Sequence, residues 1–136
     1  MSSGGMTNYS LAAQALAVAA GAALGGVARW AVGRGMNTLW AGFPLGTLAV
    51  NCLGGLLIGV ALVALVRTPD DTLRLFLVTG VLGGFTTFSA FSAESLGLLL
   101  RGAWGLALMH SALHLLGALA FTVMGYALAR ALWRWP

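Results

Sequence analysis

The segment Gly80–Phe91, GVLGGFTTFSAF, lies in the middle of a long apolar run and combines residues that a membrane helix rarely holds together. It contains three glycines, three phenylalanines, of which Phe88 and Phe91 are three positions apart among the hydroxyls, and several hydroxyls: Thr86, Thr87, Ser89 and, just beyond it, Ser92. Adjacent glycines followed by two β-branched threonines lower the helix propensity. An interrupted helix leaves amides and carbonyls that lipid cannot satisfy. The segment therefore predicts a helix that breaks inside the membrane, where a polar partner meets the freed groups.

The composition around this segment is that of a membrane protein. Of the 136 residues, 60% are hydrophobic and 7% are charged, whereas a soluble domain carries about 25% charged residues. A helix needs roughly 20 apolar residues to cross a bilayer. Apolar runs of that length predict one all-α transmembrane domain over residues 1–136, with four helices at about 11–32, 45–66, 72–100 and 103–133.

Small residues recur four positions apart in every part of this predicted bundle. The spacing places them on one helix face and allows close helix crossings. The pairs are Gly21 with Gly25, Gly55 with Gly59, Gly80 with Gly84, and Gly117 with Gly125 one further step along the same face. The pattern predicts tight packing and says nothing about activity. The single cysteine, Cys52, lies in an apolar run and is predicted to fill space in the same packing.

The net charge of +4 comes from seven arginines and no lysine. Most of these arginines stand singly at the ends of apolar runs, where they reach lipid headgroups, so no basic patch for nucleic acid is formed. The first ten residues carry no Lys or Arg, and the first apolar run is therefore predicted to be a retained helix rather than a secretory signal. Four arginines fall on one predicted side of the membrane and three on the other. Because Lys/Arg asymmetry sets the insertion direction, this balance is compatible with two opposed copies forming an antiparallel dimer.

Asn51 and Glu94 are polar residues inside predicted spans, where polar groups usually have a partner or a task. Asn51 shares a helix face with Gly55 and Gly59, so it either makes a helix-to-helix hydrogen bond, worth ~0.6 kcal/mol, or aims its amide donor into a pore. Glu94 is the only acid inside a predicted span. It is either a transporter carboxylate or, as we favour, a structural group that pairs with an arginine such as Arg29 or with water.

His110 and His114 are four positions apart and share one face of the fourth predicted helix. The spacing raises the possibility of a metal pair, but no Glu stands beside them in the sequence, and no nearby Cys or Asp completes a coordination sphere. We therefore favour a polar track along the helix or simple interhelical hydrogen bonding.

Phe88 and Phe91, three positions apart, share a face of the third predicted helix. An aromatic ring is electropositive along its edge, and hydroxyl donors flank both rings in the sequence. The combination suggests a site for a small anion. The alternative is that the two rings are lipid-facing bulk, which we would accept if the flanking alcohols and glycines were absent.

At these residues the chain resembles the Fluc (CrcB) family of fluoride channels. Three motifs in order carry the resemblance: GGVARW (Gly25–Trp30), GTLAVNCLGG (Gly46–Gly55) and TGVLGGFTTFSAFSAE (Thr79–Glu94). The family forms dual-topology, antiparallel homodimers with two fluoride pores. The resemblance thus implies a passive fluoride channel, not an enzyme, in the bacterial inner (plasma) membrane, which lets fluoride leave the cytoplasm and so relieves its toxicity. Its partners would be fluoride, lipid and a second copy of itself.

The resemblance also implies roles for individual residues. Asn51 would be the pore-lining amide, and Phe88 and Phe91 would turn their ring edges to permeating fluoride. Gly83 and Thr86 would offer backbone carbonyls to a structural sodium ion on the dimer axis, two from each subunit. The remaining implied positions are polar pore lining at Thr87, Ser89 and Ser92, and structural polar residues at Arg29 and Glu94. Where relatives place Tyr or Ser along the polar track of the fourth helix, this chain has His110 and His114, which we include in the predicted pore.

Two other functions are alternatives to the channel. A small dual-topology, proton-coupled multidrug exporter is also short and four-helical, but it needs a carboxylate in its first helix, and residues 11–32 contain none. A non-transporting assembly subunit would use polar residues only to join helices. The clustering of an amide, alcohols and aromatic rings on the second and third helices argues against that role.

Overall fold

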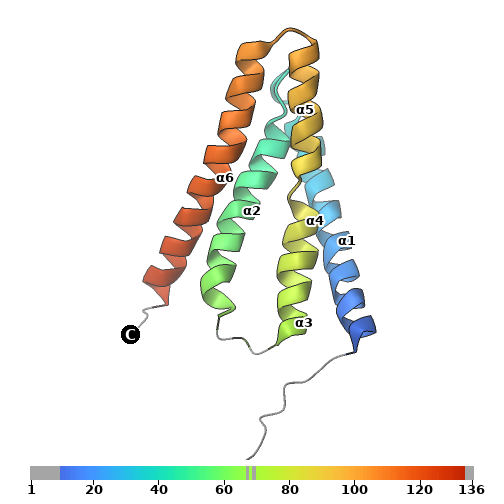
Figure 1. Ribbon diagram of the computed structural model, residues 1–136, viewed down its shortest axis with the longest axis vertical. Coiled ribbons are helices and arrows are strands. Elements are labelled where there is room, and N and C mark those ends of the chain that lie inside the picture. Colours follow the sequence, from blue (N-terminus) through green and yellow to red (C-terminus); the bar gives the residue numbers. More distant parts are fainter. Residues whose placement is uncertain (1–9, 67, 69, 134–136) are drawn as a thin grey trace, which may run out of the picture.

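The computed structural model describes residues 10–66, 68 and 70–133, and every regular element in these ranges is a helix. Figure 1 shows the helices running side by side along the long axis of the molecule. Four helical runs are long and apolar enough to cross a membrane, as predicted. They are α1 (Leu11–Met36), α2 (Leu45–Ala64), a third run made of α3 (Asp71–Arg74), η1 (Leu75–Leu82), α4 (Gly83–Phe85) and α5 (Phe88–Leu100), and α6 (Trp104–Leu132).

The helix ends follow local capping chemistry. α1 begins where predicted, and the hydroxyl of Ser10 accepts a hydrogen bond from the amide of Ala13 (3.3 Å). It continues one turn beyond the predicted end, to Met36. The third run begins one residue earlier than predicted, because the Asp70 carboxylate caps it by accepting from the amides of Thr72 and Leu73 (2.9 and 3.0 Å).

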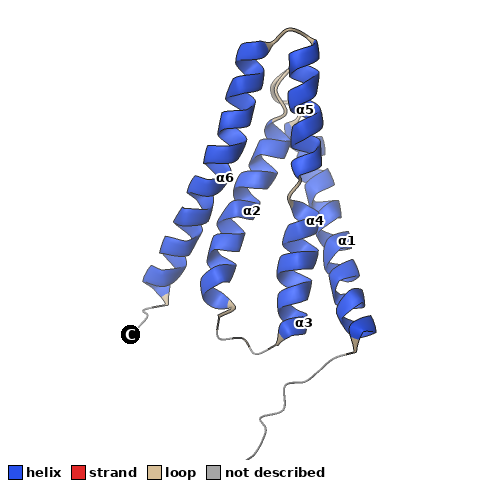
Figure 2. Cartoon of the chain, viewed as in Figure 1, coloured by secondary structure: helices blue, strands red, loops and turns tan. Residues whose placement is uncertain are grey.

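The third run is interrupted, as the sequence predicted, but not at the paired glycines. Gly83 and Gly84 are helical, and the break comes at Thr86 and Thr87, whose backbones are extended (ψ 157° and 117°). Figure 2 shows this break as the loop between α4 and α5. Upstream of it, η1 is a π-helix of eight residues, which the sequence pattern did not predict. Such wide turns occur mostly as short insertions and often near functional sites.

Glycines set the two main helix contacts. α1 packs mainly against η1 and α4, and α2 packs mainly against α6. A Cβ atom on Gly80 would lie 2.9 Å from the Cα of Gly21, and one on Gly84 would lie 2.8 Å from the Cα of Ala22. On the other side, a Cβ on Gly55 or Gly59 would collide with the backbone of α6. The predicted use of these glycines for close helix crossings is therefore confirmed.

The buried interior is small and contains several polar side chains. Most large apolar side chains face outward, as expected for a surface that lipid covers. The most buried polar residues among those described are Thr47, Thr87, His110 and His114. They come from α2, from the break, and from α6. Cys52 is buried in α2, as predicted.

Candidate functional site

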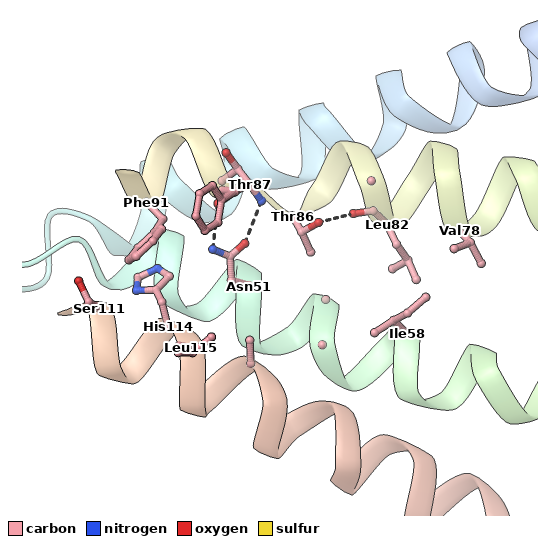
Figure 3. Close-up of a pocket in the computed structure, with 15 residues that line it drawn as sticks. Asn51, Ile58, Val78, Leu82, Thr86, Thr87, Phe91, Ser111, His114 and Leu115 are labelled. Carbon is pink, nitrogen blue, oxygen red and sulfur yellow. Dashed lines mark hydrogen bonds between the residues drawn. The ribbon is translucent and has the colours of Figure 1, made fainter. Parts of the chain in front are cut away.

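The side chain of Asn51 on α2 holds the break in the third run. Its Oδ1 atom accepts a hydrogen bond from the amide of Thr87 (2.8 Å), and its Nδ2 atom donates to the carbonyl of the same residue (3.0 Å). Figure 3 shows the carboxamide turned toward Thr87, with both hydrogen bonds drawn. Lipid cannot satisfy these backbone groups, and Asn51 satisfies both. An amide nitrogen carries two hydrogens, so one donor remains after this pairing.

Thr86 and Thr87 complete the break with their own hydroxyls. The hydroxyl of Thr86 donates to the carbonyl of Leu82 (2.9 Å), which ends α4. The hydroxyl of Thr87 accepts from the amide of Ala90 (3.1 Å) and so caps the start of α5. Threonine at these two positions therefore terminates one helix and begins the next. The hydroxyls that looked like pore lining in the sequence also have this local structural use.

The break opens onto a pocket of about 740 Å³ between α2, α6 and the third run. Apolar side chains such as Ile58, Val78 and Leu82 line one end, and polar groups line the other (Figure 3). Of the predicted pore residues, the pocket wall includes Asn51, Thr87, Phe88, Phe91 and His114, together with both predicted sodium-binding positions, Gly83 and Thr86. Ser111, which was not among the predicted site residues, also lines it.

The two phenylalanines have different surroundings. Their ring centroids lie 5.2 Å apart with planes tilted by 56°. Phe91 is half-buried and packs against the rings of His110 (5.3 Å) and His114 (4.8 Å); Figure 3 shows it beside His114. Phe88 is 78% exposed although it borders the pocket. An aromatic ring so exposed at the start of α5 is available to lipid or to another protein surface.

Ser89 and Ser92 are exposed and lie outside the pocket wall. The hydroxyl of Ser89 is 3.2 Å from the hydroxyl of Thr87, and the hydroxyl of Ser92 donates to the carbonyl of Phe88 (2.9 Å). In a single chain, these two hydroxyls therefore do not line the pocket that Asn51 lines.

A series of polar side-chain contacts joins α2, α5 and α6. The hydroxyl of Thr47 donates to Oε1 of Glu94 (2.5 Å), and Oε2 of Glu94 lies 3.4 Å from Nε2 of His110. Nδ1 of His110 is 2.9 Å from the hydroxyl of Ser95, and Nδ1 of His114 is 3.0 Å from the carbonyl of His110. The sequence did not identify Thr47 or Ser95 as site residues. Thr47 could have been found, because it precedes Asn51 by four positions on the same helix face.

The structure corrects the predicted surroundings of Glu94 and of the two histidines. No acid stands near the two histidines in the sequence, but the return of the chain at the short α5–α6 loop brings Glu94 against them. Among the described residues, no ion pair joins Glu94 to Arg29. Its Oε1 atom accepts a hydrogen bond from Thr47, and its Oε2 atom lies 3.4 Å from Nε2 of His110 without a hydrogen bond between them.

A second pocket, of about 470 Å³, lies next to the first. Arg29 and Arg34 of α1 line it, together with Glu94 and Thr47. Thr87 lines both pockets. The break in the third run thus stands between a chamber that carries two arginines and a chamber that is mainly apolar.

The carbonyl of Gly83 loses its helical partner at the break. In a continuous α-helix it would accept from the amide of Thr87, but that amide binds Asn51 instead. Thr86, with an extended backbone, is the residue at which the helical hydrogen-bond pattern stops. Oxygen atoms of this kind are the ligands that hard cations prefer. The residues present therefore fit the predicted use of these two carbonyls.

Comparison with known proteins gives one family. The family model described as CrcB-like protein, camphor resistance (CrcB), matches residues 16–126. A protein of Bordetella petrii named fluoride-specific ion channel FluC is 51% identical over 129 residues, which is 93% of this chain and 99% of that protein. Proteins with the same name from Aromatoleum aromaticum (50% identical; 88% and 92% covered) and Acinetobacter baumannii (41% identical; 82% and 90% covered) are also similar.

Proposed function

Since the chain belongs to the CrcB-like family, we propose that it is a passive fluoride-selective ion channel, a multi-pass protein of the bacterial plasma membrane that lets fluoride leave the cytoplasm. The observation that carries this proposal is a polar break with two adjacent phenylalanine rings, in a chain whose relatives at 41–51% identity are named fluoride-specific ion channels. No catalytic step is needed for this function.

The chemistry of the site suits a small, strongly hydrated anion. A selective pore must replace most of the ion's water with short donor contacts, and each contact must be weak enough to release the ion. The free Nδ2 hydrogen of Asn51, hydroxyls and the ring edges of Phe88 and Phe91 supply partial positive charge without a full charge that would hold the ion. Arg29 and Arg34 give the neighbouring chamber a positive potential that attracts anions.

We further propose that two oppositely inserted copies form the working channel. The pocket of one chain is open on one side, and Phe88 at its border is 78% exposed. A second copy that covers this side would bury Phe88 and give the pathway a complete wall. The nearly even distribution of arginines between the two predicted sides of the membrane is compatible with either orientation.

The carbonyls of Gly83 and Thr86 are the groups that would hold a sodium ion between the two copies. Both residues line the pocket, and the Gly83 carbonyl has lost its helical donor to Asn51. Two such oxygens are too few ligands for a hard cation, and a second copy would contribute its own pair, giving four carbonyl oxygens. A cation there would hold the breaks of the two copies together.

The proton-coupled exporter is not supported. The described part of α1 contains no carboxylate, and Glu94, the acid within the spans, is engaged by Thr47 and His110. The comparisons name channels and not exporters.

Fluoride efflux from proteoliposomes, measured with a fluoride-selective electrode, tests the channel. We expect fast, passive efflux that needs no proton gradient, with chloride excluded under the same conditions. Liposomes without protein give the background rate. Equal passage of chloride, pH-driven dye transport, or no flux above background would each contradict the proposed function.

A further inference from the structure

Three buried atoms converge where α5 meets α6, and each lacks a hydrogen-bond partner. They are Oε2 of Glu94 and the Nε2 atoms of His110 and His114. The two histidines are almost completely buried, at 0% and 5% exposure. One ligand atom from each of the three residues lies within 4.8 Å of the others. Leaving a polar group buried and unpaired costs about 1–3 kcal/mol, so three together in one place call for a shared partner.

From this convergence we propose that Glu94, His110 and His114 bind a divalent transition-metal ion of the zinc type. Two imidazoles and one carboxylate are a ligand set found in zinc sites that keep a fourth position for water. In a tetrahedral site with Zn–ligand bonds of about 2.0–2.2 Å, neighbouring ligand atoms lie roughly 3.3–3.5 Å apart. Glu94 Oε2 and His110 Nε2 are already separated by 3.4 Å, so His114 alone has to close on them.

The surrounding hydrogen bonds prepare the three ligands. Nδ1 of His110 is bonded to Ser95, and Nδ1 of His114 to the carbonyl of His110. When Nδ1 donates, the lone pair of a neutral imidazole lies on Nε2, which is the atom left without a partner in both rings. Thr47 fixes the other oxygen of Glu94. Partners of this kind orient metal ligands and raise their affinity.

The choice of metal follows from the ligand atoms. Imidazole nitrogen suits zinc, copper, nickel and iron, whereas sodium, magnesium and calcium prefer oxygen. The proposed site is therefore distinct from the carbonyl site for sodium at Gly83 and Thr86, in residues and in chemistry. The proposed site lies beside both pockets, because His114 lines the larger one and Glu94 lines the smaller one.

Zinc binding to the full-length protein in detergent tests the site. The protein must carry no polyhistidine tag, because a tag binds zinc itself. Titration with zinc chloride against a fluorescent zinc chelator should give one zinc ion per chain. Zinc K-edge X-ray absorption of the loaded protein should show two imidazole nitrogens, at least one oxygen and no sulfur.

Three variants and two controls complete the test. Glu94→Gln, His110→Gln and His114→Gln should each weaken zinc binding by at least about tenfold. Two control variants should bind zinc as the parent does. Asp71→Asn replaces an exposed carboxylate on α3, and Cys52→Ser replaces a buried thiol on α2. Size-exclusion profiles identify any variant that fails to fold, and the absorption spectrum of the parent needs no variant. No zinc bound by the parent, sulfur in its spectrum, or unchanged binding by the three folded variants would overturn the proposal.

Discussion

Phe91 is the side chain that links the pocket to the buried polar cluster. Its ring borders the pocket with Asn51 and packs against both histidines, at centroid distances of 5.3 Å and 4.8 Å. These contacts fix the ring plane and so determine which edge faces the pocket. An aliphatic side chain of similar volume keeps the packing but removes the electropositive edge.

Phe91→Ile is therefore expected to slow fluoride efflux from proteoliposomes by about tenfold or more, since a loss of ~1.4 kcal/mol at the rate-limiting step is a factor of ten. Protein assembly, measured by size-exclusion chromatography, should stay unchanged. Leu96→Ile, at an exposed position on the same helix and outside both pockets, is the matched control. Wild-type flux in Phe91→Ile would show that the ring edge has no part in conduction.

Individual residues show where sequence reasoning stops. Asn51 was identified because an amide inside a predicted span needs a partner. We expected it to share the face of Gly55 and Gly59, but those glycines pack against α6, whereas the Asn51 carboxamide binds the third run. Its partner, the backbone of Thr87, could not be predicted, because residues 36 apart in the sequence meet only after the helices pack. The same holds for Glu94 and His110, which the α5–α6 turn brings together.

At the scale of the helical elements, the break is a fixed joint rather than a loose hinge. The amide and the carbonyl of Thr87, which the break releases from helical hydrogen bonding, are both bound by the Asn51 carboxamide of a neighbouring helix. The sequence predicted a break in the stretch of paired glycines followed by two threonines, and the structure places it at the threonines. Gly84 packs directly on Ala22 and stays helical, while the threonine hydroxyls form hydrogen bonds at the two helix ends beyond it.

Asn51→Ala removes both contacts to Thr87 and should loosen this joint. Each unsatisfied backbone group costs about 1–3 kcal/mol, and 1 kcal/mol corresponds to a factor of about 5 in a local equilibrium. We expect at least about fivefold faster hydrogen–deuterium exchange in peptides that contain the Thr87 amide. In the control, Thr122→Val, the lost hydroxyl bonds only within its own helix, to Ala118, and exchange at Thr87 should not change. Equal exchange in Asn51→Ala and the parent would mean that the carboxamide does not hold the break.

Two glycines on the third run allow a matched stability test. A Cβ on Gly80 meets the backbone of α1 at 2.9 Å, whereas one on Gly97 meets nothing within 4 Å. Gly80→Ala is expected to lower the free energy of unfolding by ~1–3 kcal/mol. Gly97→Ala should be neutral or stabilising by up to about 1 kcal/mol, because the added Cβ meets open space and alanine favours the helix.

Thermal unfolding in detergent, followed by circular dichroism, measures both glycine variants. Similar melting temperatures for the two would contradict the close crossing of α1 and η1.

At the scale of the whole molecule, the α1–α2 and α5–α6 loops lie at one end, and the end of α2, the start of α3 and the end of α6 lie at the other (Figure 1). This up-and-down arrangement was readable from the four apolar runs and their short joints. The proposed association of two chains, and their relative orientation, would be properties of a pair. In the sequence of one chain, only the nearly even distribution of arginines bears on them.

Labelling of a single cysteine can measure the orientation. Gly35 lies in the last turn of α1, where a side chain meets nothing within 4 Å. In a Cys52→Ser background, a membrane-impermeant maleimide should label about half of the Gly35→Cys chains in sealed vesicles, because balanced flanking charge does not choose a side. Permeabilised vesicles give the total. Labelling of nearly all or nearly none of the chains in sealed vesicles would refute insertion in both orientations.

The open side of the large pocket has a consequence for the cell. If two copies form the working channel, as proposed above, a newly made single chain leaves Phe88 and one flank of the pocket facing hydrocarbon and does not form a complete pathway on its own. By mass action, the number of complete conduits then grows with the square of the copy number while chains are scarce. A cell that makes a few stray copies gains almost no leak, and a modest rise in synthesis opens the route steeply.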